Sequence, residues 1–197
     1  DAVLTNAEAE AGLPVGGTVL YPILETASAL RQAYEIAMAS PRVAYMGGAV
    51  SRFGDIHQAI GFRWTAEGRE SLYLRAKVII DARAASIRYP ISGMWGGPTN
   101  DIDGFRAFAT ELRDLGYYGM MLSFVPHVAL AHEIFTPAPA DVAYWRELVQ
   151  LADEAEATDA HQILHGDPGQ GEAHVVHGAH IGSARLNLEW ARALGVA

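Results

Sequence analysis

The chain has 197 residues, a formal net charge of −9, and a composition that is 50% hydrophobic and 19% charged. This length allows one domain with a substantial core, and the composition is that of an ordinary globular protein. The acidic balance, with no run of basic residues, argues against binding to nucleic acid or to an acidic membrane surface.

Cysteine and lysine usage narrow the chemistry further. The chain has no cysteine, which excludes disulfides and thiol catalysis and favours a cytoplasmic location. Its single lysine, Lys77, falls inside a predicted helix, so a Schiff-base mechanism is disfavoured. No apolar run approaches the ~18 residues of a membrane span, and no leader-like segment opens the chain. Because the sequence begins at Asp1 and not at Met, we expect residues upstream to be missing.

Hydrophobic periodicity and turn residues predict strands that alternate with helices. The predicted strands cover 18–24, 43–49, 87–93, 118–124 and a short stretch at 174–177. The predicted helices cover 5–11, 27–39, 66–85, 101–115, 127–134, 139–156 and 183–194. Thr65 is predicted to cap the third of these helices, and Asp101 and Asp103 to be N-terminal acids of the fourth.

This alternation predicts an α/β fold with a parallel sheet and right-handed crossovers. About four βα units make half of an eight-stranded barrel, which usually needs about 250 residues. We therefore expect the C-terminal half of a TIM-barrel-type βα repeat over 1–157, followed by a C-terminal helical tail or lid segment over 158–197. The alternative is a small open α/β sheet.

Two acidic residues follow the first two predicted strands. Glu25 closes the apolar run 19–24, and Asp55 follows the run 43–50. A carboxylate at the end of a buried strand is costly unless it binds something, and βα-repeat proteins carry their chemistry at that end. The pair is therefore predicted to hold a hard divalent cation such as Mg²⁺. The alternatives are a helix N-terminal acid for Glu25 and an Asx-turn residue for Asp55.

Four segments, in order along the chain, are similar to motifs of one enzyme family. They are Pro22-Ile23-Leu24-Glu25-Thr26-Ala27 (family P-L-I-E-T), Asp55-Ile56-His57-Gln58-Ala59-Ile60-Gly61 (D-L-a-x-d-L-G), Phe135-Thr136-Pro137-Ala138-Pro139 (F-T-P-S) and Val175-Val176-His177-Gly178-Ala179-His180-Ile181-Gly182 (v-v-D-G-k-m-I-D). From about Gly12 to its end, the chain resembles the citrate lyase β-subunit-like family of the HpcH/HpaI aldolase superfamily.

The resemblance implies a Mg²⁺-dependent TIM barrel that cleaves or forms carbon–carbon bonds in acyl-CoA or 2-hydroxy-acid substrates. Carried over, the metal ligands are Glu25 and Asp55. Two carboxylates leave positions open for substrate oxygens, and the metal then acts as a Lewis acid on the enolate. The resemblance also implies a homo-oligomer, a trimer or a hexamer.

Three departures from the family pattern bear on this expectation. Extra residues separate the second strand from Asp55, so Ser51 is a rival for the ligand position. The family has I-H-P where this chain has Phe124-Val125-Pro126. Gly182 replaces the tail aspartate, which in relatives serves acid/base chemistry on a neighbouring subunit.

Other residues are candidates for substrate binding and proton transfer. Arg52 and Arg63 flank Asp55 and could bind a substrate phosphate or carboxylate. The alternative for each arginine is an ordinary surface salt bridge. Trp95, in a glycine-rich loop, is either a lid or stacking surface or a core residue. His177 or His180 could replace the missing tail acid in proton transfer. A zinc site among the C-terminal histidines is disfavoured, because the neighbouring glycines oppose a rigid helix.

The sequence thus predicts a Mg²⁺-dependent carbon–carbon lyase of aldolase type, acting on a small hydroxy or keto acid or its CoA thioester. One alternative is an acyl-CoA thioester hydrolase on the same scaffold. Another is a non-catalytic paralogue that serves as a binding or assembly subunit, for which Gly182 and Val125 are the motive.

Overall fold

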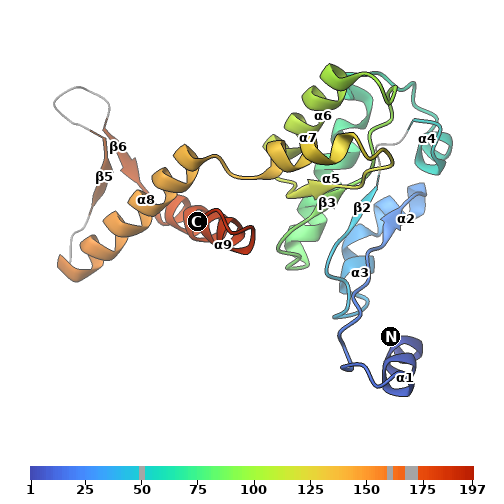
Figure 1. Ribbon diagram of the computed structural model, residues 1–197, viewed down its shortest axis with the longest axis horizontal. Coiled ribbons are helices and arrows are strands. Elements are labelled where there is room, and N and C mark those ends of the chain that lie inside the picture. The colour runs from blue at the N-terminus through green and yellow to red at the C-terminus, as the bar shows by residue number, and fades with distance from the viewer. Residues whose placement is uncertain (49–51, 159–161, 167–172) are drawn as a thin grey trace. The chain divides into compact units, whose positions relative to one another are not determined.

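The computed structural model describes residues 1–48, 52–158, 162–166 and 173–197. The chain forms two compact units, Asp1–Phe135 and Thr136–Ala197, which we describe separately. This division precedes the expected boundary at 157/158. The reason is that the long helix α8 (Pro139–Thr158) packs against the C-terminal helix α9 (Gly178–Ala193), within the second unit (Figure 1).

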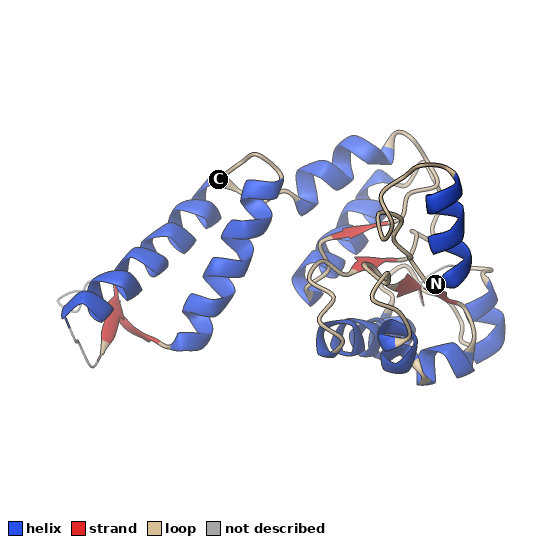
Figure 2. Ribbon diagram, turned by 90° about the horizontal axis from the view of Figure 1, so that it is seen from below, coloured by secondary structure: helices blue, strands red, loops and turns tan. Residues whose placement is uncertain are grey.

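The first unit alternates strands with helices, and its strands lie among its helices in Figure 2. Its strands are β1 (Ile23–Leu24), β2 (Gly47–Gly48), β3 (Ile91–Ser92) and β4 (Gly119–Met120). Its helices are α1 (Ala2–Glu10), α2 (Ala27–Arg31), α3 (Ala33–Met38), α4 (Asp55–Ile60), the 3₁₀ turn η1 (Arg69–Ser71), α5 (Leu72–Ala84), α6 (Ile102–Leu115) and α7 (His127–Phe135).

The strands pair in parallel, as predicted, but each ladder is shorter than the apolar runs suggested. β1 pairs with β2, and β3 pairs with β4. A parallel bridge between Leu20 and Val43 precedes the β1–β2 ladder, which begins with Ile23 opposite Gly47. From the bridge to the ladder, the first strand segment advances three residues, from Leu20 to Ile23, and its partner advances four, from Val43 to Gly47. The pairing register therefore shifts by one residue. Pro22 lies within this step, and it has no N–H to donate to the ladder.

Two helices of the first unit differ from their predictions, one in its interior and one at its start. The helix predicted over 27–39 is interrupted at Gln32, which separates α2 from α3. The prediction that Thr65 caps the next helix is wrong. Its N–H and hydroxyl bind the Glu70 carboxylate at 2.8 and 2.7 Å, and the chain turns through Gly68 (φ +63°) before η1 begins.

Helix α6 begins and ends as its sequence predicts. The Asp101 side chain accepts a hydrogen bond from the Gly104 N–H at 2.9 Å, and Asp103 lies in the first turn. Gly116 ends the helix in the left-handed conformation, with φ +104°. These local signals agree with tertiary packing, because the buried face of the helix contributes to the core.

Two buried clusters form the core of the first unit. One joins β1 to α2, α3, α4 and α5, and its larger members are Leu24, Leu30, Met46, Ile56, Val78 and Ile87. The other gathers around α6 and α7, and includes Trp95, Phe105, Phe108, Leu112, Ile134 and Phe135. The buried side chains of the helices therefore pack around the short strands and hold them in place.

The second unit is a helical hairpin with a small antiparallel ladder. β5 (Ile163–His165) pairs with β6 (His174–Val176), which confirms the predicted strand near 174 and adds a partner. Helix α9 begins at Gly178, earlier than predicted, because Ile181 packs on the buried cluster of Leu148, Val176 and Ala184 and His180 binds the His177 N–H at the helix start. Over the described ranges, no helix has the length and apolarity needed to cross a membrane.

Candidate metal centre at the strand ends

Glu25 follows β1 directly and its side chain is exposed. It stands before helix α2 and does not cap it. The cap is Thr26, whose hydroxyl oxygen accepts a hydrogen bond from the Ala29 N–H at 3.0 Å. The alternative interpretation of Glu25, an acid at a helix N-terminus favoured by the dipole, is compatible with this position, one residue before the cap of α2.

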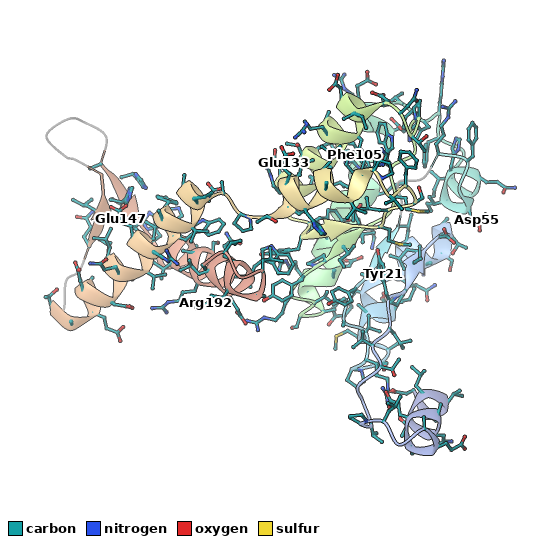
Figure 3. All side chains as sticks on the ribbon, in the orientation of Figure 1. Tyr21, Asp55, Phe105, Glu133, Glu147 and Arg192 are labelled. Carbon is teal, nitrogen blue, oxygen red and sulfur yellow. The ribbon has the colours of Figure 1, made fainter. Side chains whose placement is uncertain are left out.

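Asp55 is the first residue of α4 and is also exposed (Figure 3). The segment that leads into it contains Phe53, which has a positive φ of +60° and is 81% exposed. The Phe53 N–H donates to Nδ1 of His57 at 3.0 Å, so the neutral imidazole carries its proton on Nε2. Positive φ is costly for a bulky residue, and such conformations are typical of functional sites.

The parallel register relates the two acidic residues. Leu24 lies opposite Gly48, so β1 and β2 end side by side, with Glu25 directly after β1 and Asp55 seven residues after Gly48 in the sequence. Helices α2 and α4, which start beside the two acids, contact each other. Among the residues that the structure describes, no three His, Asp or Glu side chains gather to hold a metal.

Arg52 packs on aromatic rings next to Asp55. Its guanidinium carbon lies 4.5 Å from the ring centroid of Phe53 and 5.3 Å from that of Trp64. Cation–π contacts of this kind hold the side chain over the surface near Asp55. Arg63 is exposed in the turn after α4. Ser51, the rival for the ligand position, lies outside the described residues.

Trp95 belongs to the core, which favours the core reading over that of a lid. It is 8% exposed, and its indole N–H donates to the carbonyl oxygen of Pro98 at 3.1 Å. Its ring centroid lies 5.8 Å from that of Trp64, in an edge-on contact, and 5.3 Å from that of Phe108, in a tilted one. A buried ring with its N–H satisfied stabilises the loop and offers no face for stacking.

His177 and His180 lie in the second unit, at the start of α9. His177 is the N-cap residue, and its backbone N–H donates to Nδ1 of His180 at 3.2 Å. Both side chains are exposed, with ring centroids 5.7 Å apart. His180 therefore has a local structural role at the helix start, and proton transfer by either histidine stays a prediction. His161, another candidate zinc ligand, lies outside the described residues.

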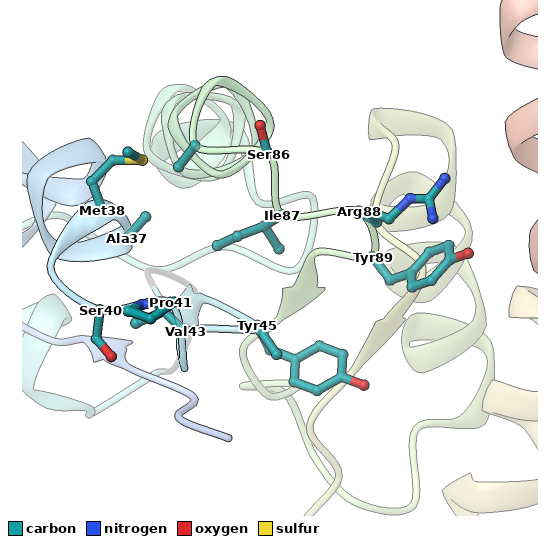
Figure 4. Close-up of a pocket in the computed structure, with 12 residues that line it drawn as sticks. Ala37, Met38, Ser40, Pro41, Val43, Tyr45, Ser86, Ile87, Arg88 and Tyr89 are labelled. Atoms are coloured by element: carbon teal, nitrogen blue, oxygen red, sulfur yellow. The ribbon is translucent and has the colours of Figure 1, made fainter. Parts of the chain in front are cut away.

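Two hollows bracket the strands of the first unit. A cavity of about 590 Å³ lies where the chain enters β2 and β3 and includes Tyr45, Ile87 and Tyr89 (Figure 4). It is thus at the amino ends of the strands, opposite to Glu25. A second, of about 410 Å³, lies against α4 and the residues that flank it, and is lined by Phe53, Gly54, His57, Gln58, Gly61 and Phe62. Its lining includes neither Glu25 nor Asp55, although Gly54 precedes Asp55 directly.

Sequence reasoning missed three residues that shape this end of the strands. They are Tyr21, Gly47 and Gly96, which make close contacts between segments that are distant in the sequence. The signal was present for the glycines, because glycine inside a strand often marks the close approach of another backbone. Nothing in the local pattern distinguished Tyr21 from other apolar strand residues.

The fold is one of parallel βα units, with Glu25 directly after the first strand and Asp55 at the start of the helix that follows the second. Residues 1–123 match the family model of HpcH/HpaI aldolase/citrate lyase. The chain therefore belongs to this family, which is a family of lyases.

Individual comparisons agree with the family. The chain is 31% identical over 177 residues to an L-malyl-CoA/β-methylmalyl-CoA lyase of Rhodobacter capsulatus, covering 81% of this chain and 54% of the relative. A citrate lyase structure from Burkholderia xenovorans aligns with a TM-score of 0.76 at 15% identity, covering 100% of this chain and 59% of that one. The CitE protein of Mycobacterium tuberculosis, in complex with magnesium, acetoacetate and coenzyme A, aligns with a TM-score of 0.64 at 15% identity, covering 95% and 72%.

These structural likenesses are below 25% identity and show the fold, which is the α/β fold of the family. The chain spans about half the length of the curated relatives it matches.

Proposed function

We propose that this chain contributes the magnesium-binding half of a carbon–carbon lyase that acts on a small hydroxy or keto acid or its CoA thioester. The observation that carries the proposal is the parallel β1–β2 register, in which the two strands end side by side, with Glu25 directly after β1 and Asp55 seven residues after Gly48. Family membership supports the lyase class, and the magnesium complex of the CitE protein supports the metal.

The donor set suits magnesium. Two exposed carboxylates offer hard oxygen ligands, and their small number leaves room for the waters that Mg²⁺ retains. When bound, the ion would supply the Lewis acidity that stabilises the enolate formed as the carbon–carbon bond breaks.

The residues around Asp55 suit the organic part of an acid substrate. The hollow of about 410 Å³ presents the rings of Phe53 and Phe62, and His57 offers its Nε2–H as a donor. Arg52 places a positive charge beside the Phe53 ring, where it can meet a substrate carboxylate or phosphate. Rings and donors would together orient the substrate oxygens toward the acidic pair.

Titration calorimetry with Mg²⁺ tests the metal ligands in the 197-residue chain. We expect Glu25→Gln and Asp55→Asn each to weaken Mg²⁺ binding at least ~10-fold, because each removes one of two anionic ligands. The matched controls are Glu35→Gln and Asp103→Asn, which remove exposed carboxylates from the first turns of α3 and α6. The controls should bind Mg²⁺ as the unaltered chain does.

Equal Mg²⁺ affinity in Glu25→Gln and the unaltered chain would refute the metal assignment. Turnover is tested on 3-hydroxy-diacid CoA thioesters, with chromatography of the thioester and acid products. Cleavage of the carbon–carbon bond supports the lyase, whereas release of free CoA thiol alone supports the thioester hydrolase. Magnesium binding without turnover, in the chain combined with the other half of the barrel, supports the non-catalytic paralogue.

A further inference from the structure

Tyr21 forms a side-chain connection between the two strand pairs of the first unit. Its hydroxyl lies 3.2 Å from the carbonyl oxygen of Ile91 and 3.1 Å from that of Ser92, to which it donates. Burial raises the pKa of the Tyr21 phenol to about 12, so the group keeps its proton and acts as a donor. Among the described residues, β1–β2 and β3–β4 are separate two-stranded ladders. The Tyr21 hydrogen bond thus joins the segment just before β1 to β3.

Gly47 makes this connection possible. Tyr21, labelled in Figure 3, precedes β1, and its hydroxyl reaches the carbonyl oxygens of β3 close to Gly47 of β2. A Cβ atom at Gly47 would lie 2.4 Å from the Tyr21 hydroxyl oxygen and 2.4 Å from the Ile91 carbonyl oxygen. Real Cβ atoms do not come this close to backbone, so only glycine fits between Tyr21 and β3 at this point.

The segment before Asp55 is held by the same strand through the loop that follows it. A Cβ atom at Gly96 would lie 2.5 Å from the backbone nitrogen of Arg52 and 2.9 Å from Nε1 of Trp64. The loop after β3 therefore rests directly on the backbone three residues before Asp55. Trp95, buried beside it, anchors this loop in the core.

The segments that carry the two acidic residues thus both contact β3 or the loop that follows it. Glu25 is tied to β3 through Tyr21, and Asp55 to the loop through the contact of Gly96 with Arg52. We infer that Tyr21 is a positioning residue that fixes Glu25 relative to Asp55 and so sets the magnesium affinity of the pair. This inference rests on the proposed function, because it assigns Tyr21 to the metal centre proposed there.

The physical reason is the short ladder that holds β1. With only Ile23 and Leu24 in regular pairing and a register shift before them, the backbone of β1 constrains Glu25 weakly. A metal centre needs its ligands held within about 0.5 Å of the productive geometry by surrounding packing and hydrogen bonds. The phenol of Tyr21 supplies such a constraint from outside the first layer of ligands.

The test compares Tyr21→Phe with Tyr117→Phe. The Tyr117 hydroxyl also donates to a backbone carbonyl, that of Arg75, at 2.8 Å, and it is buried in the same unit. Each variant removes one phenol–carbonyl hydrogen bond of similar strength, so both should lower the melting temperature by a similar amount. Calorimetry at a temperature where all variants are folded then measures Mg²⁺ affinity alone.

We expect Tyr21→Phe to weaken Mg²⁺ binding about 5-fold, the effect of about 1 kcal/mol, and Tyr117→Phe to leave it unchanged. Gly47→Ala, checked for folding by circular dichroism, should weaken Mg²⁺ binding further, because its methyl group displaces the Tyr21 hydroxyl.

Two results separate the inference from the proposed function. If Glu25→Gln weakens Mg²⁺ binding but Tyr21→Phe does not, Tyr21 is only a structural residue and the inference is overturned. If Tyr21→Phe and Tyr117→Phe weaken binding equally, the effect is one of general stability, and the inference also fails. If Glu25→Gln has no effect, the proposed function and the inference fall together.

Discussion

Glu25 and Thr26 are adjacent at the end of β1, but only Thr26 caps the helix that follows. The Thr26 hydroxyl accepts a hydrogen bond from a backbone N–H of α2, and Glu25 lies one residue before this cap, where the helix dipole favours an acid. The Glu25 carboxylate is exposed. Thr26 could be recognised from sequence as a cap, but the exposure of Glu25 needed the structure.

Trp95 shows the opposite case, in which a side chain in a glycine-rich loop is part of the core. We expect Trp95→Ala to destabilise the chain by about 3–5 kcal/mol, because it removes a large buried ring and leaves a cavity. Chemical denaturation measures this loss. The control is Phe53→Ala, since Phe53 is 81% exposed and its removal should change stability little. A Trp95→Ala variant as stable as the unaltered chain would contradict the core assignment.

At the scale of elements, helix α1 is held to the sheet by a buried ion pair. The Arg42 guanidinium donates to Glu8 at 2.9 and 2.7 Å and to the Thr5 hydroxyl at 2.9 Å. Glu8 also accepts from the N–H groups of Gly16 and Thr18 at 2.8 and 2.6 Å. Every oxygen of the Glu8 carboxylate is thus hydrogen-bonded, which offsets the cost of burying the charge.

This network makes the attachment of α1 dependent on pH. The hydrogen bond from Arg42, followed by that from the Gly16 N–H, holds the pKa of Glu8 far below the ordinary value of 4.5. Because the pKa is lowered by folding, the stabilisation is complete above about pH 4.5 and is lost as the pH falls below it. We expect the melting-temperature difference between the unaltered chain and Glu8→Gln to be largest near neutral pH and to shrink below pH 4.5.

The control for this experiment is Glu10→Gln, which removes an exposed carboxylate from the same helix. It should change the melting temperature little at any pH. A Glu8→Gln variant whose deficit stays constant from pH 7 to pH 3 would contradict the assignment of the pH dependence to Glu8.

For the whole molecule, the first strand segment presents an exposed apolar side, as the half-barrel interpretation predicts. Val19 is 50% exposed and Ile23 is 43% exposed, and their even spacing puts them on one side of an extended segment. Leu20 and Leu24, at the alternate positions, face the opposite side, and Leu24 is buried in the core. Large exposed apolar side chains beside an open sheet edge favour association with further strands or another chain.

We therefore expect the 197-residue chain to self-associate in sedimentation velocity experiments at micromolar concentration. Val19→Ser with Ile23→Ser should reduce this association, because it removes apolar surface that is already exposed. The matched control is Val125→Ser, an 83% exposed residue in the loop before α7. A chain that is monodisperse and monomeric, with no change in the double variant, would contradict the half-barrel interpretation.

The sequence by itself determined the alternation of strands and helices, the ends of α6 and the family resemblance. Those features depend on side-chain period, on Asp101 and Gly116 as caps, and on motifs within short segments. Only the tertiary structure decided the register shift near Pro22, the burial of Trp95 and the contacts of Tyr21, Gly47 and Gly96. These features depend on tertiary contacts between segments that are distant in the sequence, and local propensity carries no information about such contacts.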